Sequence, residues 1–187
     1  MTSNPSETSP KARWFDLRLF AVLVVGFCVF LNVYSTQAIL PMLAHVFGAS
    51  ELHASLTISA TTLAVAVAAP FAGLTAERVG HKTVIVAAIF LMSLQTFLYA
   101  TSRSLNALIA WRFAQGLVMP GIIAVTMAYI SEEFPPTKIG AAMSAYVAGN
   151  VLGGVVGRLM SGWIGAKFGW EWTFPVLGLL VLIGAVI

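Results

Sequence analysis

The stretch "GLTAERVGHK", residues 73–82, concentrates charge in a chain that otherwise avoids it. It contains Glu77, Arg78 and Lys82, whereas the whole chain of 187 residues has only ten Lys and Arg and seven Asp and Glu. Charged residues make up 9% of the sequence, compared with about 25% in an ordinary soluble domain. Charge gathers where a chain meets water, so this stretch predicts a short polar turn between apolar segments.

The sequence around that turn is apolar enough to cross a membrane several times. Hydrophobic residues account for 59% of the chain, and the mean hydropathy is +0.91. A spanning helix needs about 20 mostly apolar residues. Six segments satisfy this requirement: Leu19–Ala44, Leu52–Leu74, Thr83–Ala100, Leu105–Ile130, Ile139–Ile164 and Trp170–Ile187. The sequence therefore predicts an all-α membrane protein with six transmembrane helices over residues 18–187, joined by short loops that make successive helices antiparallel neighbours.

The first residues and the basic residues predict how the bundle is oriented. Residues 1–17 are polar, with Ser, Thr and Pro, and are expected to form a disordered tail. Lys and Arg near spanning helices favour the cytoplasmic side. One side of the bundle receives Lys11, Arg13, Arg18, Arg78, Lys82 and Lys138, and the other receives Arg103 and Lys167. We therefore expect a multi-pass protein of the plasma membrane (the inner membrane in a bacterium) with a cytoplasmic N-terminus.

Residues 73–82 also resemble a family signature, the sequence G-x-L-A-D-R-x-G-R-K of the major facilitator superfamily. That family carries the signature between its second and third helices, where this chain has it. Glu77 takes the acidic position, while Thr75 and His81 depart from the pattern. The matching residues are Gly73, Ala76, Arg78, Gly80 and Lys82. For this motif the resemblance implies a latch on the cytoplasmic side, formed by Glu77, Arg78 and Lys82, with Gly80 making the turn.

Two further motifs are similar to those of the same family. "RFAQG" in the fourth segment resembles R-x-x-Q-G, with Arg112, Gln115 and Gly116 matching. "GNVLGGVVGR", residues 149–158, resembles G-x-x-x-G-P-x-x-G-G, which is typical of the drug and sugar efflux branches. Here Gly154 replaces the proline and Arg158 replaces the last glycine, so proton antiport through this motif is left open.

Together the motifs cover nearly the whole chain, and the family has twelve helices in two halves. The resemblance therefore implies the N-terminal six-helix half of a secondary active transporter, which exports a small molecule by alternating access with a second half or a homodimer partner. It implies no cofactor. Apart from Glu171, at the start of the sixth segment, the six segments contain no carboxylate that could carry a proton. A truncated, non-transporting membrane scaffold is the alternative function.

Seven polar residues within the segments form a candidate substrate path. They are Asn32, Ser35, Thr36, Arg112, Gln115, Asn150 and Arg158. An arginine at the membrane centre costs at least about 2.5 kcal/mol unless it has partners. The partners of Arg112 could be residues of the missing half, a bound anion, or backbone carbonyls and water. Arg158 could instead extend to the nearby interface, and the polar side chains of the first helix could bond back to their own backbone.

Small residues recur every four positions in the fifth segment and predict a packing face. The row is Ala141, Ala145, Gly149, Gly153, Gly157, Ser161 and Gly165. Small-xxx-small rows let helices approach closely in lipid. We assign Gly149, Gly153, Gly154 and Gly157 to this packing motif, and we expect a single half to leave the face partly without its usual neighbour. The parallel row of Asn150, Gly154 and Arg158 is expected to face a cavity.

Several classes of function are disfavoured by what the sequence lacks. The single cysteine, Cys28, lies in an apolar run, and no Cys/His spacing typical of a metal site is present. The chain has no long basic run that would bind nucleic acid. His45, His53 and His81 all lie near segment ends, without a HExxH or GxSxG motif. An enzyme is therefore not predicted.

Overall fold

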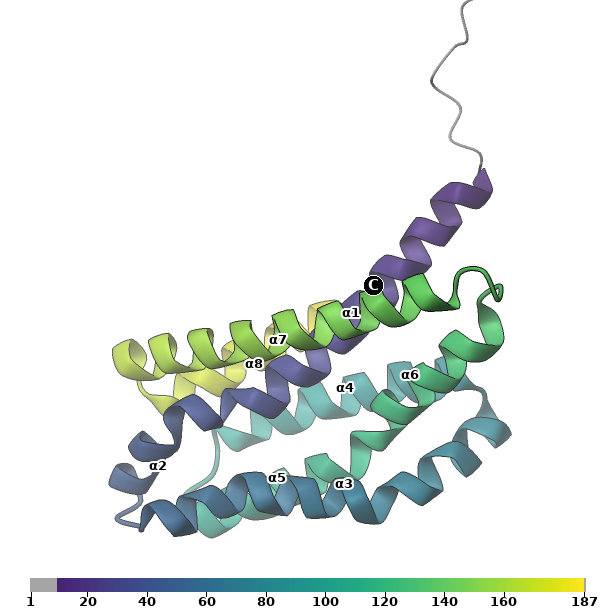
Figure 1. The fold of residues 1–187 in the computed structure, drawn as a ribbon. Helices are drawn as coiled ribbons and strands as arrows, with labels where there is room; N and C mark the ends of the chain where they lie inside the picture. Colours follow the sequence, from purple (N-terminus) through teal and green to yellow (C-terminus); the bar gives the residue numbers. More distant parts are fainter. Residues whose placement is uncertain (1–9, 187) are drawn as a thin grey trace, which may run out of the picture.

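The computed structural model describes residues 10–186, with side chains from residue 17 to 185, and this part of the chain consists of helices joined by short turns, without strands (Figure 1). The elements are α1 (Pro10–Ser35), the 3-10 helix η1 (Gln37–Ile39), α2 (Leu40–Val46), α3 (Glu51–Val79), α4 (His81–Tyr99), α5 (Leu105–Val118), α6 (Pro120–Glu133), α7 (Ile139–Phe168) and α8 (Trp170–Val186). Five stretches are long and apolar enough to cross a membrane, and Trp170–Ala185 is a shorter apolar helix. The predicted all-α membrane fold is confirmed.

Prolines divide two of the spans into two helices each. Pro41 lies in the first turn of α2, and Pro120 begins α6 directly after α5 ends. Proline lacks a backbone N–H and is best tolerated in the first turn of a helix, which favours the start of a new helix at each of these residues. α3, in contrast, continues through Pro70 without a break.

The N-terminal boundary differs from the expected one. α1 begins at Pro10, so residues 10–17, assigned to the tail from composition, are helical and continue the first span. Proline suits the first turn of a helix, where its missing N–H has no partner to lose. The remainder of the predicted tail, residues 1–9, lies outside the described residues.

Residues 73–82 form helix ends and not a loop, which corrects the prediction of a polar turn. Glu77 and Arg78 lie in the last turn of α3, and His81 and Lys82 lie in the first turn of α4. Gly80 alone separates the helices, with φ of 91°, a conformation that side chains with a Cβ rarely adopt. One residue therefore reverses the chain.

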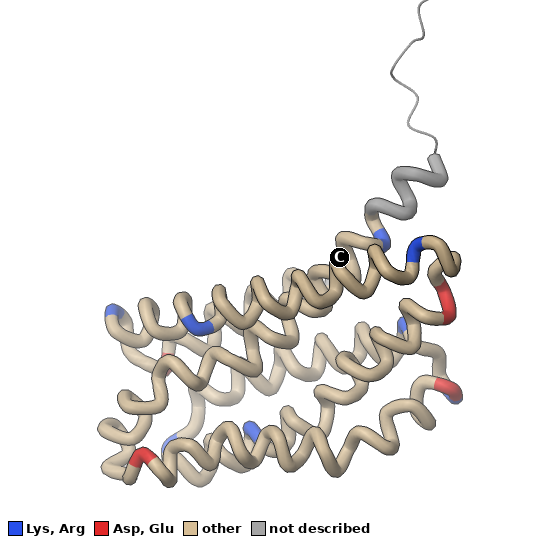
Figure 2. The backbone as a smooth tube through the Cα atoms, viewed as in Figure 1, with Lys and Arg blue, Asp and Glu red and all other residues tan. Residues whose placement is uncertain are grey.

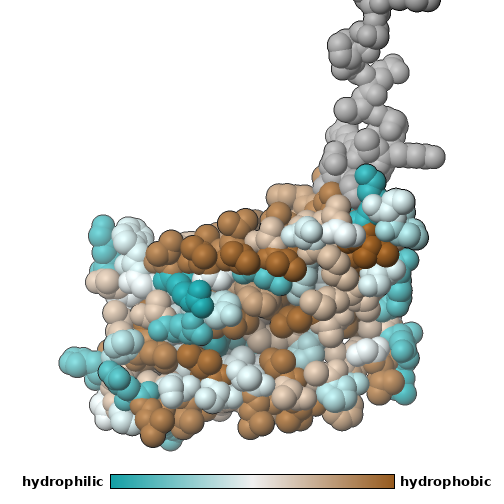
Figure 3. Space-filling view, in the orientation of Figure 1, coloured by the Kyte–Doolittle hydropathy of each residue, from teal (hydrophilic) through white to brown (hydrophobic). Residues whose placement is uncertain are grey.

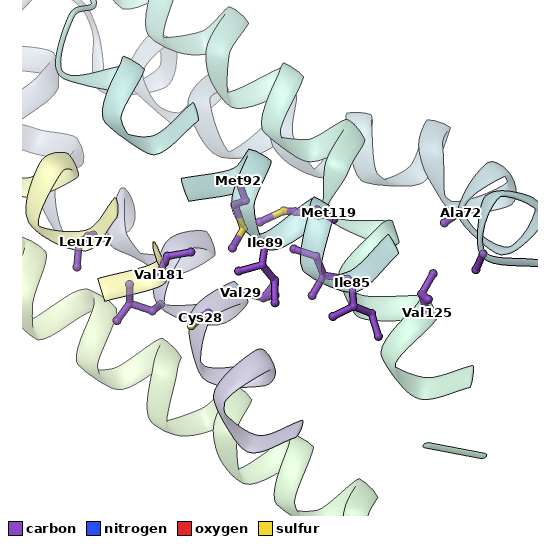
Figure 4. Packing of buried hydrophobic residues seen from close by; sticks show 14 residues of the cluster. Cys28, Val29, Ala72, Ile85, Ile89, Met92, Met119, Val125, Leu177 and Val181 are labelled. Carbon is purple, nitrogen blue, oxygen red and sulfur yellow. The ribbon is translucent and has the colours of Figure 1, made fainter. Parts of the chain in front are cut away.

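The most extensive packing occurs between helices that are not consecutive: α1 packs against α7, α3 against α5, and α4 against α8. Successive spans are antiparallel (Figure 1), but they are not the main neighbours that short loops predicted. Long helices bury most surface where their faces match, and a short loop does not choose that face. Figure 4 shows the resulting core, in which Cys28 and Val29 of α1 approach Ile89, Met92 and Val181 of other helices.

Glycines bring α7 directly onto the backbone of α1. A methyl group on Gly149, Gly153 or Gly157 would overlap the carbonyl groups of Leu23, Phe27 and Leu31, respectively. The small-residue face therefore has its neighbour within this chain, and the expectation that it would lack one is wrong. Gly154 lies beside this row, next to the ring of Tyr34.

Charged residues gather at the two ends of the bundle, with few between them (Figure 2). We name these ends by residues: the Gly80 end, with the α3–α4 junction, and the Arg103 end, with the α4–α5 connection. Between the ends, the described part of the bundle has arginines on α5 and α7, which are Arg112 and Arg158. These two residues are the starting point for the functional site.

Candidate functional site

Arg112 is completely buried, with a relative exposure of 0%, at the meeting point of α1 and α5. Its Nη1 donates to Gln115 Oε1 at 2.8 Å and to the carbonyl oxygen of Asn32 at 3.3 Å. Its Nη2 donates to the carbonyl oxygen of Val33 at 3.1 Å. The guanidinium also lies 5.8 Å from the centre of the Tyr99 ring. Of the three alternatives left open for its partners, backbone carbonyls and a neighbouring amide are what the structure shows.

Those carbonyls are available because α1 ends beside Arg112. Asn32 and Val33 belong to the last four residues of α1, which ends at Ser35. The last four carbonyls of a helix lack partners within it, and they form the negative end of the helix dipole. The end of α1 thus supplies the partial negative charge that a carboxylate would otherwise provide.

Amide and hydroxyl groups extend the network from Arg112 to α4. Gln115 Nε2 donates to Asn32 Oδ1 at 2.8 Å, and Asn32 Nδ2 donates to Thr96 Oγ1 at 2.6 Å. Thr96 in turn donates to the carbonyl oxygen of Met92 at 2.7 Å. Asn32, Thr96 and Gln115 are all buried at 0% exposure. The network joins α1, α4 and α5 into one rigid polar unit inside the bundle.

The other two polar residues of the first helix behave differently from Asn32. Ser35 Oγ donates to the carbonyl oxygen of Asn32 at 2.8 Å, which is the local back-bonding that the sequence left as an alternative. Thr36 Oγ1 is buried without a hydrogen-bond partner, as are Tyr99 Oη and Arg112 Nε. Buried polar atoms normally have a hydrogen-bond partner. These three atoms can therefore each form a further hydrogen bond, and they lie in one part of the network.

Arg158 occupies a contrasting environment on the exposed side of α7. Its Nε donates to Gln37 Oε1 at 3.0 Å, and its guanidinium lies 4.0 Å above the centre of the Tyr34 ring. Within the described residues, its two Nη groups donate to no protein atom and no acidic side chain pairs with it. Gln37 thus bonds to one edge of the guanidinium and Tyr34 covers one of its faces. The edge with the two Nη groups has no protein partner among the described residues.

The glycine that replaces the family's proline makes room for this contact. A methyl group on Gly154 would lie 3.0 Å from Cδ2 of the Tyr34 ring, which is closer than almost any real contact. Gly154 is one helical turn before Arg158, so the ring lies flat against α7 below the guanidinium. The two departures from the efflux motif, at Gly154 and Arg158, are therefore parts of a single local structure.

The remaining predicted site residue, Asn150, joins neither arginine. It is partly buried on α7, and its Oδ1 has no hydrogen-bond partner. The structure thus brings Asn32, Arg112 and Gln115 together, places Arg158 in a separate cluster, and leaves Asn150 two turns away along α7.

Sequence reasoning missed four residues of the two arginine clusters: Tyr34, Gln37 and Tyr99, which contact an arginine, and Thr96, which bonds to Asn32. A usable signal existed for Thr96, because it is a polar residue inside an apolar span and therefore needs a partner. Tyr34 and Gln37 lie in the same segment as Asn32, but their contact with α7 depends on how two distant helices pack.

At the Gly80 end, Glu77, Arg78 and Lys82 are exposed and form no ion pair within the described residues. The ion pair at this end joins His81 Nδ1 of α4 to Glu132 Oε2 of α6, at 3.4 Å. A groove of about 460 Å³ runs between α3, α4 and the α5–α6 span, and its lining is mostly apolar. No group of three metal-binding side chains occurs among the described residues.

Comparison with known proteins places these observations in a family. The model described as "Major Facilitator Superfamily" matches residues 22–187. The inner membrane transport protein YnfM of Escherichia coli is 33% identical over 88% of this chain and 40% of its own length. The multidrug export protein EmrB of Haemophilus influenzae is 26% identical over 88% of this chain and 34% of its own length. These relatives are transporters and not enzymes.

A solved structure has the same fold. The crystal structure of a bacterial homologue of the human lysosomal transporter Spinster, in an inward-facing and occupied conformation, matches with a TM-score of 0.79. The identity is 16%, and the match covers 96% of this chain and 44% of that protein. The chain spans about two fifths of the length of the curated relatives it matches.

Proposed function

Because this chain belongs to the major facilitator superfamily, we propose that it forms the N-terminal half of a secondary transporter that exports a small molecule by alternating access. The observation that supports this proposal most strongly is the sequence match to transporters. The chain aligns with about two fifths of the length of each of these relatives. A second six-helix half, or a second copy, would then close the cavity. Relatives named for drug export favour efflux as the direction.

The buried network supports a role for Arg112 in organising that cavity. It ties the end of α1 to α4 and α5 without a carboxylate, and it retains unpaired polar atoms at Arg112 Nε, Thr36 and Tyr99. In secondary transporters, broken helices near the membrane centre commonly expose such backbone groups to a substrate. The break between α1 and α2 beside Arg112 has this character.

The orientation that we propose places the Gly80 end in the cytoplasm, because six of the eight flanking basic residues lie at that end. Labelling of Val79→Cys, on a Cys28→Ser background, tests this orientation. An impermeant thiol reagent added to intact cells should leave position 79 unmodified and should label it in inverted vesicles. Labelling from outside would reverse the orientation.

Transport itself is tested by comparing this chain alone with the chain co-expressed with a second six-helix half. Efflux of ethidium and of radiolabelled benzoate from loaded cells is the measurement, at matched membrane expression. We expect saturable efflux of a tested compound only when a second half is present or when the chain dimerises. Flux by verified monomers would contradict the need for a second half, and no flux in any form would favour the scaffold alternative.

A further inference from the structure

Arg158 is an exposed charge on an otherwise apolar part of α7. The other exposed residues there are Val151, Leu152, Val155, Leu159 and Trp163. Arg158 and Phe168, at the end of the helix, are ten positions apart, which corresponds to about 15 Å of helix. An arginine this far from the helix end must face water, protein or an anion, because lipid tails offer it no acceptor.

The surface around Arg158 is polar where α7 passes the end of α1. Figure 3 shows a hydrophilic patch interrupting a hydrophobic surface in the middle of this face. Gln37 supplies a partly buried amide beside the guanidinium, and Tyr34 supplies an aromatic platform. Tyr34 belongs to α1 and Gln37 to η1, and the glycines of α7 bring α7 into close contact with both elements.

The contacts of Arg158 orient it for one kind of ligand. Gln37 accepts from Nε and the Tyr34 ring covers one face of the guanidinium, while the two Nη groups donate to no protein atom among the described residues. Two parallel N–H donors match the two oxygens of a carboxylate. A ring that stacks on the guanidinium restricts its rotation and reduces the ordering cost of binding.

We infer that Arg158, Tyr34 and Gln37 form a binding site for a small organic carboxylate, which rests on the proposed transport function. No carboxylate of the described chain pairs with the guanidinium, so its Nη donors are available to the carboxylate of a ligand. An aromatic or aliphatic body attached to the carboxylate would lie on the apolar residues that surround Arg158 on α7. The substrate class assigned to this half is therefore an amphipathic monocarboxylate.

Binding, measured without transport, tests the site. The purified chain in nanodiscs of neutral phosphatidylcholine is titrated with benzoate, or with its uncharged analogue benzamide, by saturation-transfer NMR. We expect wild type to bind benzoate, and Arg158→Gln to bind it about tenfold or more weakly, because two charge-assisted hydrogen bonds are lost. Benzamide should bind without any dependence on Arg158. Arg158→Lys should recover only part of the affinity, since lysine lacks the planar fork.

Lys167→Gln is the matched control, because Lys167 is also an exposed cation of α7 above an aromatic ring, at 5.0 Å from Trp163. It should leave benzoate binding unchanged. Gly154→Ala should weaken binding by displacing Tyr34, whereas Gly162→Ala, whose added methyl would meet Ala38 at an ordinary 3.6 Å, should not. Circular dichroism confirms that each variant is folded.

Three outcomes would overturn the inference: equal benzoate affinity in wild type and Arg158→Gln, absence of benzoate binding to wild type, or equal losses in Arg158→Gln and Lys167→Gln. Nanodiscs containing phosphatidylglycerol separate a lipid headgroup from a small molecule. If that lipid displaces benzoate only when Arg158 is present, the site belongs to headgroups and the small-molecule assignment fails. None of these results depends on flux, so transport by the complete protein would stand independently.

Discussion

Two arginines at membrane depth contact the same short segment of α1 and η1, yet in opposite ways. Arg112 is fully buried and donates hydrogen bonds to the carbonyl oxygens of Asn32 and Val33. Arg158 is exposed and contacts the side chains of Tyr34 and Gln37. A helix end can neutralise a buried cation with its free carbonyls, whereas an exposed cation held by side chains keeps donors for something else. The comparison separates a buried arginine held by the end of a helix from an exposed arginine that we propose binds a ligand.

The largest expected effect is the loss of Arg112. Arg112→Ala leaves Gln115 Oε1 and the carbonyl oxygen of Val33 without a donor, while the carbonyl oxygen of Asn32 keeps only Ser35 Oγ. Each buried acceptor left unpaired costs about 1–3 kcal/mol. We expect a marked loss of stability, measured by SDS titration in mixed micelles, and loss of transport by the complete protein. Arg112→Lys should recover little, because one ammonium cannot reach all three acceptors. Wild-type stability in Arg112→Ala would show that the buried network is dispensable.

The next largest loss of stability is expected when α1 and α7 are forced apart, because both arginines contact the α1–η1 segment. Gly153→Val drives a side chain into the backbone of Phe27, and such overpacking costs about 1–3 kcal/mol or more. Gly140→Val, on the same helix but with open space around it, is the control and should be nearly neutral. The measurement is the same SDS titration. Equal stability of the two variants would contradict the glycine-mediated contact.

A smaller effect is expected at the far end of the buried network. Thr96→Val keeps the shape of the side chain but removes the acceptor for Asn32 Nδ2, at a cost of about 1 kcal/mol. Thr62→Val, which removes an exposed hydroxyl bonded to its own helix, is the control. If Thr96→Val affects benzoate binding at Arg158 more than stability, the two arginines are coupled and not independent.

The smallest effect on stability is expected for Arg158 itself. Arg158→Gln removes an exposed cation–π contact and one hydrogen bond, and we expect a change below about 1 kcal/mol. The same SDS titration measures the stability of both variants, so the loss in Arg158→Gln can be compared directly with the loss in Arg112→Ala. A loss as large as that of Arg112→Ala would show that Arg158 is a structural residue and would remove the distinction between the two.

Much of the fold was predictable from sequence because it depends on local properties, while part of the site was not. Arg112 and Gln115 were identified from their motif and their spacing on one helix face, and Asn32 from its place in an apolar span. The separation of Arg158 from Asn150, and its contact with Tyr34, could not be read from spacing, because they depend on which helices pack together. The latch residues Glu77, Arg78 and Lys82 stay a prediction, since within the described residues they form no ion pair.

The sequence by itself determined the six apolar segments and a reversal of the chain between the second and the third, and the structure reduced that reversal to Gly80. A helix in lipid satisfies its own backbone, so length and hydropathy suffice to specify it. Only the tertiary structure decided what neutralises each arginine. Asn32 and Val33 become acceptors because α1 ends next to α5, and Tyr34 becomes a platform because Gly154 lets it lie against α7. Those partners are far apart along the chain, and the packing of helix backbones alone brings them into contact.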